Sequence, residues 1–294
     1  MKKITVFTPT YNRAYCLHNL YESLIKQTSK DFEWLIIDDG STDNTKELIQ
    51  SWIDQSDFKI IYHYKENGGM HTAHNIALKL IKTELNVCID SDDFMTKNAI
   101  EIILNKWYKN KTNKCAGILA LNSYKNGKIV SSKKFPKNIE VGKYSKLKVD
   151  YNLVGDVKFI YSTDIINKYK SYPTFKEENF VPLGYKYRLI DRDYNMLFLN
   201  KIVCIVEYMD DGSTKNMFKQ YYNNPKGFAY SRLITMNNMH SVKDNFIQAI
   251  HFNAESILSK NSILKNNNNI FLTLIAFPFG VLLYLYIIYI NKQK

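Results

Sequence analysis

The first 110 residues alternate between short apolar runs and segments with helical periodicity. Four predicted strands are each followed by a predicted helix. Alternation of this kind forms a parallel sheet with helices on its faces, joined by right-handed crossovers. We therefore expect an α/β fold. The strands are expected at Lys3–Thr8, Phe32–Ile37, Phe58–Tyr64 and Leu85–Ile89. The helices are expected at Ala14–Gln27, at a segment capped by Thr42 or Asp43 and running to about Ile53, at Met70–Ile81 and at Lys97–Lys109.

Beyond residue 110 the pattern is less regular. We expect strands at Cys115–Leu121 and Lys201–Tyr208, and a hairpin at Asn126-Gly127, a dipeptide typical of tight turns. Residues 214–259 are polar, aromatic and helical in pattern. A chain of 294 residues suffices for one large α/β domain with an appendage.

Polar motifs follow each of the first four predicted strands. The carboxyl ends of parallel strands lie along one edge of a sheet, and ligands of open α/β sheets bind at that edge. We therefore expect these motifs to converge on one cleft. They are Thr8–Arg13 (TPTYNR), Asp38–Asp43 (DDGSTD), Glu66–Gly69 (ENGG) and Asp90–Asp93 (DSDD).

Each motif alone also fits a turn or a helix cap. Together they place five aspartates at one edge, and clustered carboxylates need a cation or hydrogen-bond donors nearby. An Asp-x-Asp loop offers the hard oxygen ligands that Mg²⁺ or Mn²⁺ prefers, and such ions usually also hold substrate phosphates. The chain has no Walker loop and no G-x-G-x-x-G after its first strand. A nucleotide diphosphate held through a metal ion is the ligand that this pattern favours.

In this order and spacing, the four motifs resemble glycosyltransferase family 2, whose members have the GT-A fold and invert the anomeric centre. The resemblance covers residues 3 to about 125 well. It continues more loosely to about residue 230 through Phe175–Pro182, Val206–Ser213 and Asn224–Phe228, which look like bacterial members from surface-polysaccharide pathways. It implies transfer of a hexosyl or N-acetylhexosaminyl group from a nucleotide-diphosphate sugar, most commonly a UDP-sugar, to a glycan or lipid-linked acceptor.

The resemblance also implies roles for individual residues. Pro9, Thr10 and Tyr11 would surround the nucleotide base, and Asp39 would accept a base N–H with Asp38 beside it. Asp92 would bind Mn²⁺ or Mg²⁺, with Asp93 close behind. The remaining nucleotide-sugar contacts would be Arg13, Asn67, Gly69, His71, Asp90 and Ser91.

His71 and His74 stand where many relatives carry Arg or Lys. Either can reach a diphosphate, although we expect a solvated helix face for at least one of them. Inversion also needs a base that deprotonates the acceptor hydroxyl, usually a carboxylate. The resemblance places this base at Glu178, with Glu177 as the alternative because the register is uncertain by one residue. On the acceptor side it is followed by Tyr185, Tyr187 and Arg188.

Charge and cysteine content concern partners and location. The net charge is +12, but the lysines are scattered and no basic run of five occurs, so nucleic-acid binding is not expected. The four cysteines form no C-x-x-C pair, and Met1 leads into a strand without a signal sequence. This pattern is typical of a reducing cytoplasm.

Ile270–Ile290 contains no charged residue. At 1.5 Å per residue this segment is ~31 Å long, about one hydrocarbon core. We expect a membrane anchor at the cytoplasmic face, in which Pro278 and Gly280 either kink one spanning helix or divide a shallow hairpin. The predicted organisation is a catalytic domain (1–213, with a nucleotide-sugar half 1–125 and an acceptor half 126–213), a helical extension (214–265) and the membrane segment (270–290).

Two other functions remain open. A nucleotidyltransferase uses a similar sheet, but its Gly-rich first loop with Lys or Arg is not supplied by residues 8–13. A degenerate transferase fold that only binds a sugar nucleotide or glycan would lack turnover. The intact Asp-x-Asp and the glutamate pair favour the active enzyme.

Overall fold

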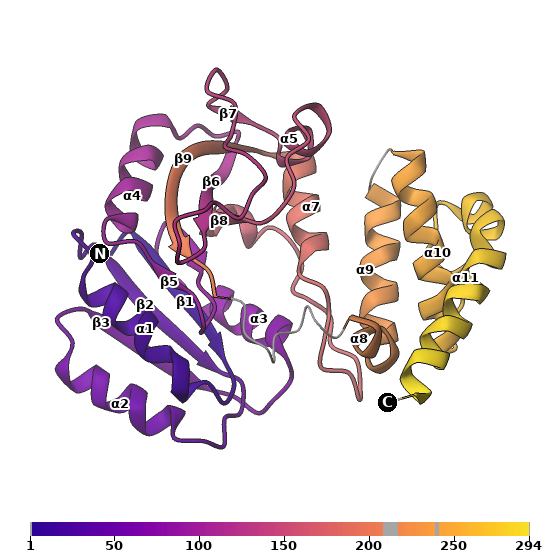
Figure 1. Cartoon of the computed structure of the whole chain (residues 1–294), viewed down its shortest axis with the longest axis horizontal. Coiled ribbons are helices and arrows are strands. Elements are labelled where there is room, and N and C mark those ends of the chain that lie inside the picture. The colour runs from indigo at the N-terminus through magenta and orange to yellow at the C-terminus, as the bar shows by residue number, and fades with distance from the viewer. Residues whose placement is uncertain (1, 208–216, 239–240, 294) are drawn as a thin grey trace. The chain divides into compact units, whose positions relative to one another are not determined.

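The computed structural model describes residues 2–207, 217–238 and 241–293 (Figure 1). Within these residues the chain forms two compact units. The sheet unit comprises residues 2–67, 73–170 and 193–207. The helical unit comprises residues 68–72, 171–192, 217–238 and 241–293. Residues 171–192, which belong to the expected acceptor half, lie in the helical unit.

The described strands form a single sheet in the order β3-β2-β1-β4-β8-β6-β9-β5, with β7 paired to β9. The first four members run parallel, which confirms the α/β fold. β8 is antiparallel to both β4 and β6, so the sheet is mixed beyond β4. The strands are β1 (Ile4–Thr10), β2 (Phe32–Asp38), β3 (Lys59–Tyr64), β4 (Leu85–Cys88), β5 (Phe94–Met95), β6 (Cys115–Ser123), β7 (Val141–Gly142), β8 (Val157–Ser162) and β9 (Asn195–Ile205).

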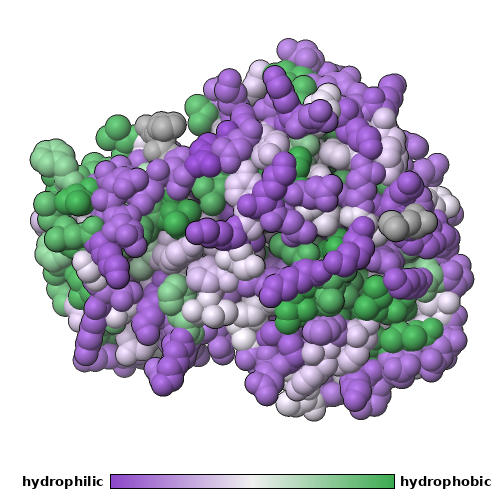
Figure 2. Space-filling view, turned by 180° about the vertical axis from the view of Figure 1, so that it is seen from behind, coloured by the Kyte–Doolittle hydropathy of each residue, from purple (hydrophilic) through white to green (hydrophobic). Residues whose placement is uncertain are grey.

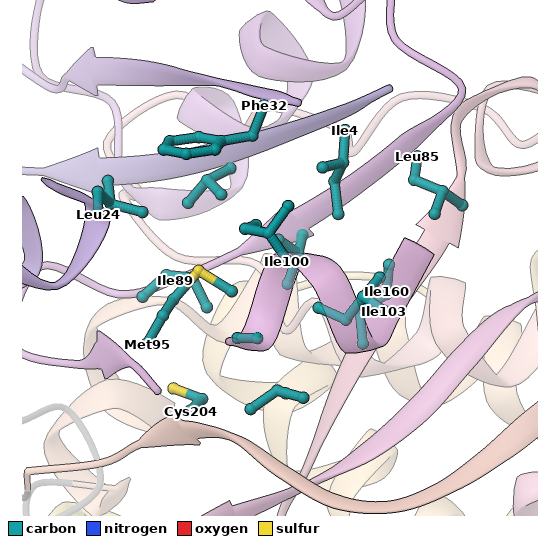
Figure 3. Close-up of a cluster of buried hydrophobic side chains, with 14 of the residues drawn as sticks. Ile4, Leu24, Phe32, Leu85, Ile89, Met95, Ile100, Ile103, Ile160 and Cys204 are labelled. Atoms are coloured by element: carbon teal, nitrogen blue, oxygen red, sulfur yellow. The ribbon is translucent and has the colours of Figure 1, made fainter. Parts of the chain in front are cut away.

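The core of the sheet unit follows from the two-residue period of its strands. Ile4 and Val6 of β1 point to the face covered by α1 (Ala14–Ile25), α2 (Thr45–Gln55) and α4 (Ala99–Asn110). Phe7 points to the opposite face, where α3 (Met70–Leu80) packs. Figure 3 shows the larger cluster, in which side chains from strands and helices interdigitate around Ile100 and Ile103.

Two local expectations can be compared with the structure. The Asn126-Gly127 turn forms, with Gly127 at φ +81° and its N–H donating to the Tyr124 carbonyl, but a single bridge between Ser123 and Ile129 takes the place of a second strand. Helix α2 begins at Thr45, and the Asp43 carboxylate accepts hydrogen bonds from the N–H and hydroxyl of Thr45, which agrees with the expected capping role of Asp43. The short helices α5 (Tyr144–Asp150) and α6 (Thr163–Ile166) complete this unit.

The helical unit contains α7 (Gly184–Asp193), of which Asp193 belongs to the sheet unit, α8 (Met217–Asn223), α9 (Pro225–Asn238), α10 (Val242–Ser259) and α11 (Ile270–Lys292). The expected helical character of residues 214–259 is thus seen in α8, α9 and α10, while residues 214–216 lie outside the described residues. One apolar cluster joins α9, α10 and α11 around Phe252 and Ala276. A second, around Tyr172 and Val181, joins the segment before α7 to α7 and α9.

Helix α11 is continuous through Pro278, so the segment is not divided into a hairpin. By length and composition it is apolar enough to cross a membrane.

Candidate active site

The ends of β1 and β2 lie side by side, with Thr10 paired to Asp38. Asp38 is 1% exposed. One carboxylate oxygen accepts the N–H of Ser41 at 2.8 Å, and the other accepts the hydroxyl of Tyr62 at 2.7 Å. Burial, reinforced by this carboxylate, raises the pKa of Tyr62 well above its usual range. Asp38 therefore holds the turn after β2 and anchors it to β3.

Asp39 is also buried, and its carboxylate forms an ion pair with the ammonium of Lys65. The side-chain amide of Asn67 donates to the Asp39 carbonyl at 2.8 Å and to its carboxylate at 3.4 Å. The structure thus brings Asp39 and Asn67 together, as the sequence predicted. Lys65 was missed, although its place directly after β3, whose Tyr64 pairs with Asp38, brings it beside Asp39.

The loop after β1 is tied to the loop after β2. Asn12, at φ +53°, accepts the N–H groups of Thr42 and Asp43 through its side-chain oxygen, at 2.7 and 3.3 Å. Its own N–H donates to the Ser41 hydroxyl at 2.9 Å. These bonds fix the two loops that carry the expected base-binding residues.

Those residues differ in exposure. Pro9 and Thr10 are buried in β1, and Tyr11 is 48% exposed. The Thr10 hydroxyl has no hydrogen-bond partner among the described residues. A buried hydroxyl without a partner costs about 1–3 kcal/mol, so this atom favours a bound ligand or water at the sheet edge. Arg13 is half-buried and its guanidinium lies 5.6 Å from the Tyr15 ring centroid.

The loop after β4 carries the other acidic motif. Asp90 and Asp92 are half-buried, whereas Ser91 and Asp93 are buried. β4 pairs with β1, so this loop shares the sheet edge with the motifs after β1 and β2. Asp90 and Asp92 are therefore the two residues of this motif that solvent reaches.

Asp93 is held by its own partners. Its carboxylate lies 3.4 Å from the ammonium of Lys158 on β8 and accepts the N–H of Glu207 at 3.3 Å. Burial raises the pKa of Asp93 to about 6, and the Lys158 charge opposes that shift. The sequence pattern gave no signal for Lys158, because it comes from the irregular segment that forms the antiparallel strand β8.

The two histidines of α3 are not on a solvated face. His71 is 1% and His74 3% exposed, so the expectation of a solvated position for at least one of them was wrong. His74 packs edge-on against Phe7 with ring centroids 5.0 Å apart, and its Nε2 lies 3.7 Å from the Cys88 Sγ. His74 precedes the buried Ala77 by three residues, so it lies on the side of α3 that faces the sheet.

The glutamate pair lies in the helical unit. Glu178 is 9% exposed, and its two carboxylate oxygens accept the N–H groups of Lys226 and Gly227 at 2.9 and 2.8 Å. It therefore caps the N-terminus of α9. Burial raises the pKa of Glu178, and these two N–H bonds oppose the rise. Glu177 is exposed and left-handed at φ +67°.

The Asn-Gly-Gly turn contacts the segment that carries the glutamates. Gly69 has φ +87°, and a Cβ atom there would lie 1.7 Å from the carbonyl oxygen of Asn179. The N–H of Asn179 donates to the Asn224 side chain at 2.9 Å. Only glycine allows this approach of two backbones. Two motifs that lie far apart in the sequence therefore meet within the helical unit.

Of the expected acceptor-side residues, Tyr185 packs in the interior, edge-on to Tyr172 and Tyr230. Tyr187 is half-buried and Arg188 is exposed. Of the resembling segment Val206–Ser213, Val206 and Glu207 are described and residues 208–213 lie outside the described residues.

Asp90 and Asp92 suit a divalent cation, because carboxylate oxygens are the ligands that Mg²⁺ and Mn²⁺ prefer. Among the described residues no group of three or more His, Cys, Asp or Glu is placed to hold a metal ion. An ion at this loop would therefore complete its coordination with substrate phosphates and water, as Mg²⁺ commonly does.

Comparison with known proteins identifies relatives of the N-terminal part. Glycosyltransferase GlyG of Streptococcus pneumoniae is 32% identical over 121 residues, which are 41% of this chain and 39% of GlyG. Chondroitin synthase of Pasteurella multocida is 31% identical over 129 residues, 44% of this chain and 13% of the synthase. The matched segment thus spans well under half of these relatives.

Solved structures show the same fold at low identity. S. aureus TarS 1-349 in complex with UDP-GlcNAc has a TM-score of 0.57 at 18% identity, covering 87% of this chain and 72% of that one. Mannosyltransferase PcManGT from Pyrobaculum calidifontis, in complex with GDP-Man and Mn²⁺, has a TM-score of 0.56 at 16% identity, covering 95% and 73%. These likenesses support the GT-A fold.

The family model described as glycosyl transferase family 2 matches residues 5–170. This range contains β2, β3, β4, all of β1 but Ile4, and each of the four strand-end motifs. The chain belongs to glycosyl transferase family 2.

Proposed function

We propose that this chain is an inverting glycosyltransferase whose donor is a nucleotide-diphosphate sugar, with UDP as the nucleotide. The observation that carries the proposal is the gathering of Asp38, Asp39, Asn67 and the Asp90–Asp93 loop at one sheet edge in a family 2 chain. The UDP-GlcNAc, UDP and GDP-Man complexes of proteins with the same fold support a nucleotide-sugar donor.

In this proposal the loops after β1 and β2 bind the nucleotide. The base lies against Pro9, Thr10 and Tyr11, where the Thr10 hydroxyl gains the partner that it lacks among the described residues. Asp39 is oriented by Lys65 and Asn67 to accept a base N–H. Asp38 fixes the turn after β2 through its hydrogen bonds with Ser41 and Tyr62.

The Asp90–Asp93 loop holds the diphosphate end of the donor. Asp92 is the proposed ligand of Mn²⁺ or Mg²⁺, and Asp93 is the second candidate. Asp93 also fixes the loop through its ion pair with Lys158. A bound divalent cation would neutralise charge on the departing nucleotide diphosphate. The Mn²⁺ in the PcManGT complex supports a divalent cation.

Inversion requires one proton transfer and one exchange of bonds. The base takes the proton of the acceptor hydroxyl as the acceptor oxygen bonds to the anomeric carbon. The bond from that carbon to the diphosphate breaks on the opposite face, and its electron pair leaves with the nucleotide. We assign the base to Glu178, with Glu177 as the alternative, and the acceptor side to the neighbouring Tyr185, Tyr187 and Arg188. The acceptor class is a hydroxyl of a lipid-linked or polymeric glycan in surface-polysaccharide synthesis, at the cytoplasmic face of the membrane.

One observation favours a second function. Both oxygens of Glu178 already accept backbone N–H groups, as they would in a purely structural cap. A catalytically degenerate chain that only binds a sugar nucleotide would carry this arrangement. Turnover separates the two functions, because both predict donor binding and only the enzyme transfers the sugar.

The test is a thermal-shift panel of UDP-, GDP- and dTDP-sugars with and without Mn²⁺. A ligand that binds only the native state at a hundredfold excess over Kd stabilises it by about 2.7 kcal/mol. We expect a metal-dependent shift with UDP-sugars that is lost in Asp92→Ala. The matched control is Asp57→Ala, since Asp57 is an exposed aspartate of the same unit.

Nucleotide release with glycan acceptors then measures turnover. A shift with turnover supports the transferase, and a shift without turnover under any acceptor supports the binding protein. If no sugar nucleotide shifts the wild-type protein, the donor assignment is wrong.

A further inference from the structure

One face of α11 is buried against other helices over most of its length. The buried residues are Thr273, Ala276, Gly280 and Ile287, whose spacing places them on a single helix face. Phe246 of α10 packs edge-on against Phe279 with ring centroids 5.9 Å apart. The helix is therefore an integral part of the helical unit.

Polar contacts secure both ends of this packing. The side-chain amide of Asn253 on α10, which is fully buried, donates to the Thr273 carbonyl at 2.8 Å. At the other end the Asn291 amide donates to the Phe218 carbonyl of α8 at 3.2 Å, and Phe218 lies edge-on to Tyr286. Hydrogen bonds at the first and last turns therefore attach α11 to α10 and to α8.

In the middle, Gly280 brings the backbones of α10 and α11 together. A Cβ atom at position 280 would lie 2.4 Å from the Asn253 Cβ and 3.0 Å from the Ile250 carbonyl oxygen. No larger residue fits this contact without a shift of one helix. The seam is thus built from a glycine and buried amides, and it extends from the first turn of α11 to the last.

The opposite face of α11 is apolar and exposed. Figure 2 shows hydrophobic residues gathered at the left edge of the view, where α11 lies. Phe271 is 78%, Leu282 65% and Tyr289 59% exposed. The other exposed apolar side chains of the helix are Ile270, Leu274, Ile275, Phe277 and Leu285, together with Phe279 and Tyr286, which are half-exposed and also contact α10 and α8.

This packing conflicts with a transmembrane orientation. A helix that spans the bilayer is surrounded by lipid or by other spanning helices. α11 instead packs on α8 and α10, which carry the exposed charges of Lys219, Lys243 and Asp244. Charged side chains at the bilayer centre are strongly unfavourable. To span, α11 would have to leave the seam and expose the buried Asn253.

We propose that α11 lies in the plane of an anionic membrane surface, with its outer face in the boundary between headgroups and acyl chains and its inner face still packed on α10. Helices that bind in this manner combine an apolar face with a positive rim. From residue 217 to 292 the chain has seven Lys or Arg and two acidic residues. Lys260 and Lys265 before the helix, and Lys292 at its end, are all exposed. The proposal concerns attachment and is independent of the donor and acceptor assigned above.

Depth measurements distinguish the two orientations. Phe271→Trp, Leu282→Trp and Tyr289→Trp, made singly, place a tryptophan at the start, middle and end of one helix face. These variants are added to anionic vesicles whose lipids are brominated at shallow, middle or deep acyl positions. The native Trp34, Trp52 and Trp107 are buried in the sheet unit, so only the introduced residue should be quenched. We expect the same shallow depth at all three positions.

A spanning helix gives a different pattern, since positions 271 and 289 are separated by ~27 Å along the axis. Position 282 would then be the deepest and the two ends shallow, which overturns the proposal. Leu282→Glu should weaken sedimentation with anionic vesicles at least about 10-fold, because a buried leucine is lost from the interface. Val154→Glu is the matched control, as Val154 is 68% exposed on the sheet unit.

The competing occupant of this face is a second copy of the chain. Failure of the protein to sediment with anionic vesicles would contradict membrane docking, whether the protein is monomeric or dimeric. A dimer that Leu282→Glu dissociates in analytical ultracentrifugation would then identify the second copy as the occupant. Equal binding to neutral and anionic vesicles would overturn the role of the positive rim.

Discussion

Asp38, Asp39 and Asp93 of the sheet unit each lie beside strong donors, whereas Glu255 of the helical unit is fully buried with the Arg232 guanidinium at 3.5 Å. Neither carboxylate oxygen of Glu255 has a hydrogen-bond partner among the described residues. Accordingly, burial raises the pKa of Glu255 to about 8.

The difference follows from where each carboxylate sits on the backbone. Loops after strands have N–H groups that take no part in the hydrogen bonds between strands, such as those of Ser41 and Glu207. Glu255 lies beyond the first turn of α10, where every N–H is already bonded within the helix. Glu178 agrees with this rule, because its donors are the free N–H groups in the first turn of α9. A buried acid is well hydrogen-bonded after a strand or at the first turn of a helix, and poorly beyond that turn.

The largest expected effect sharpens the comparison at Glu178. Glu178→Gln should lower the transfer rate about 10²- to 10⁴-fold, the usual contribution of a general base. Because a glutamine has one acceptor oxygen for two N–H groups, stability should also fall by about 1 kcal/mol. Steady-state transfer and thermal unfolding measure the two effects separately.

Glu177→Gln is the control for this pair, since Glu177 is exposed and its neighbours are unchanged. Transfer should remain near the wild-type rate. Loss of transfer in Glu177→Gln, with retention in Glu178→Gln, would move the base by one residue and leave Glu178 as a cap alone.

The next effect tests the well-partnered acids. Asp93→Asn should lower the free energy of unfolding by about 3–5 kcal/mol, because the buried Lys158 ammonium loses its counter-charge. Urea unfolding measures this change. The double variant Asp93→Asn with Lys158→Met should recover much of the loss. A single variant as stable as wild type would mean that the pair does not hold the loop.

A smaller effect is expected at the α10–α11 seam. Gly280→Val should destabilise the helical unit by about 1–3 kcal/mol through overpacking against Asn253 and Ile250. Gly184→Ala provides the control, because a Cβ at Gly184 meets nothing within 4 Å. Equal unfolding temperatures for the two variants would contradict the close packing of the seam.

The poorly partnered acid predicts a pH dependence. The pKa of Glu255 rises on folding from 4.5 to about 8, so its contribution to stability is lost as pH rises through this range. Burial lowers the pKa of His251 from 6.5 to about 4, so below pH 6.5 this histidine makes the free energy of unfolding rise with pH, opposite to Glu255. Of these two groups, Glu255 is the one that contributes between pH 6.5 and 8, by about 1.4 kcal/mol per pH unit at most.

Glu255→Gln should remove this slope between pH 6.5 and 8 in urea unfolding. Wild type should lose stability across the interval relative to the variant. Parallel curves for the two proteins would show that Glu255 is ionised in the folded state across the interval and that Arg232 is a better partner than its 3.5 Å contact indicates.

The sequence predicted the parallel strands and the meeting of their polar ends because both follow from local pattern. β1 to β4 differ from expectation by two residues or fewer at each end. Lys65 was missed because its contact depends on the register of β2 and β3. Lys158 was missed because β8 inserts antiparallel between β4 and β6, which no periodicity in that segment indicates. His74 was misjudged because a polar residue type concealed its place on the apolar side of α3.

The contact between Gly69 and Asn179 has a consequence for the order of events during synthesis. Gly69 leaves the ribosome 110 residues before its partner, so at about 5–20 residues per second the turn waits roughly 5–20 s for the backbone against which it rests. The strands on either side of residues 68–72 are β3 and β4, which can pair with β2 and β1 in that interval. The nascent chain therefore carries an unfinished turn between two finished strands until residue 179 has been made.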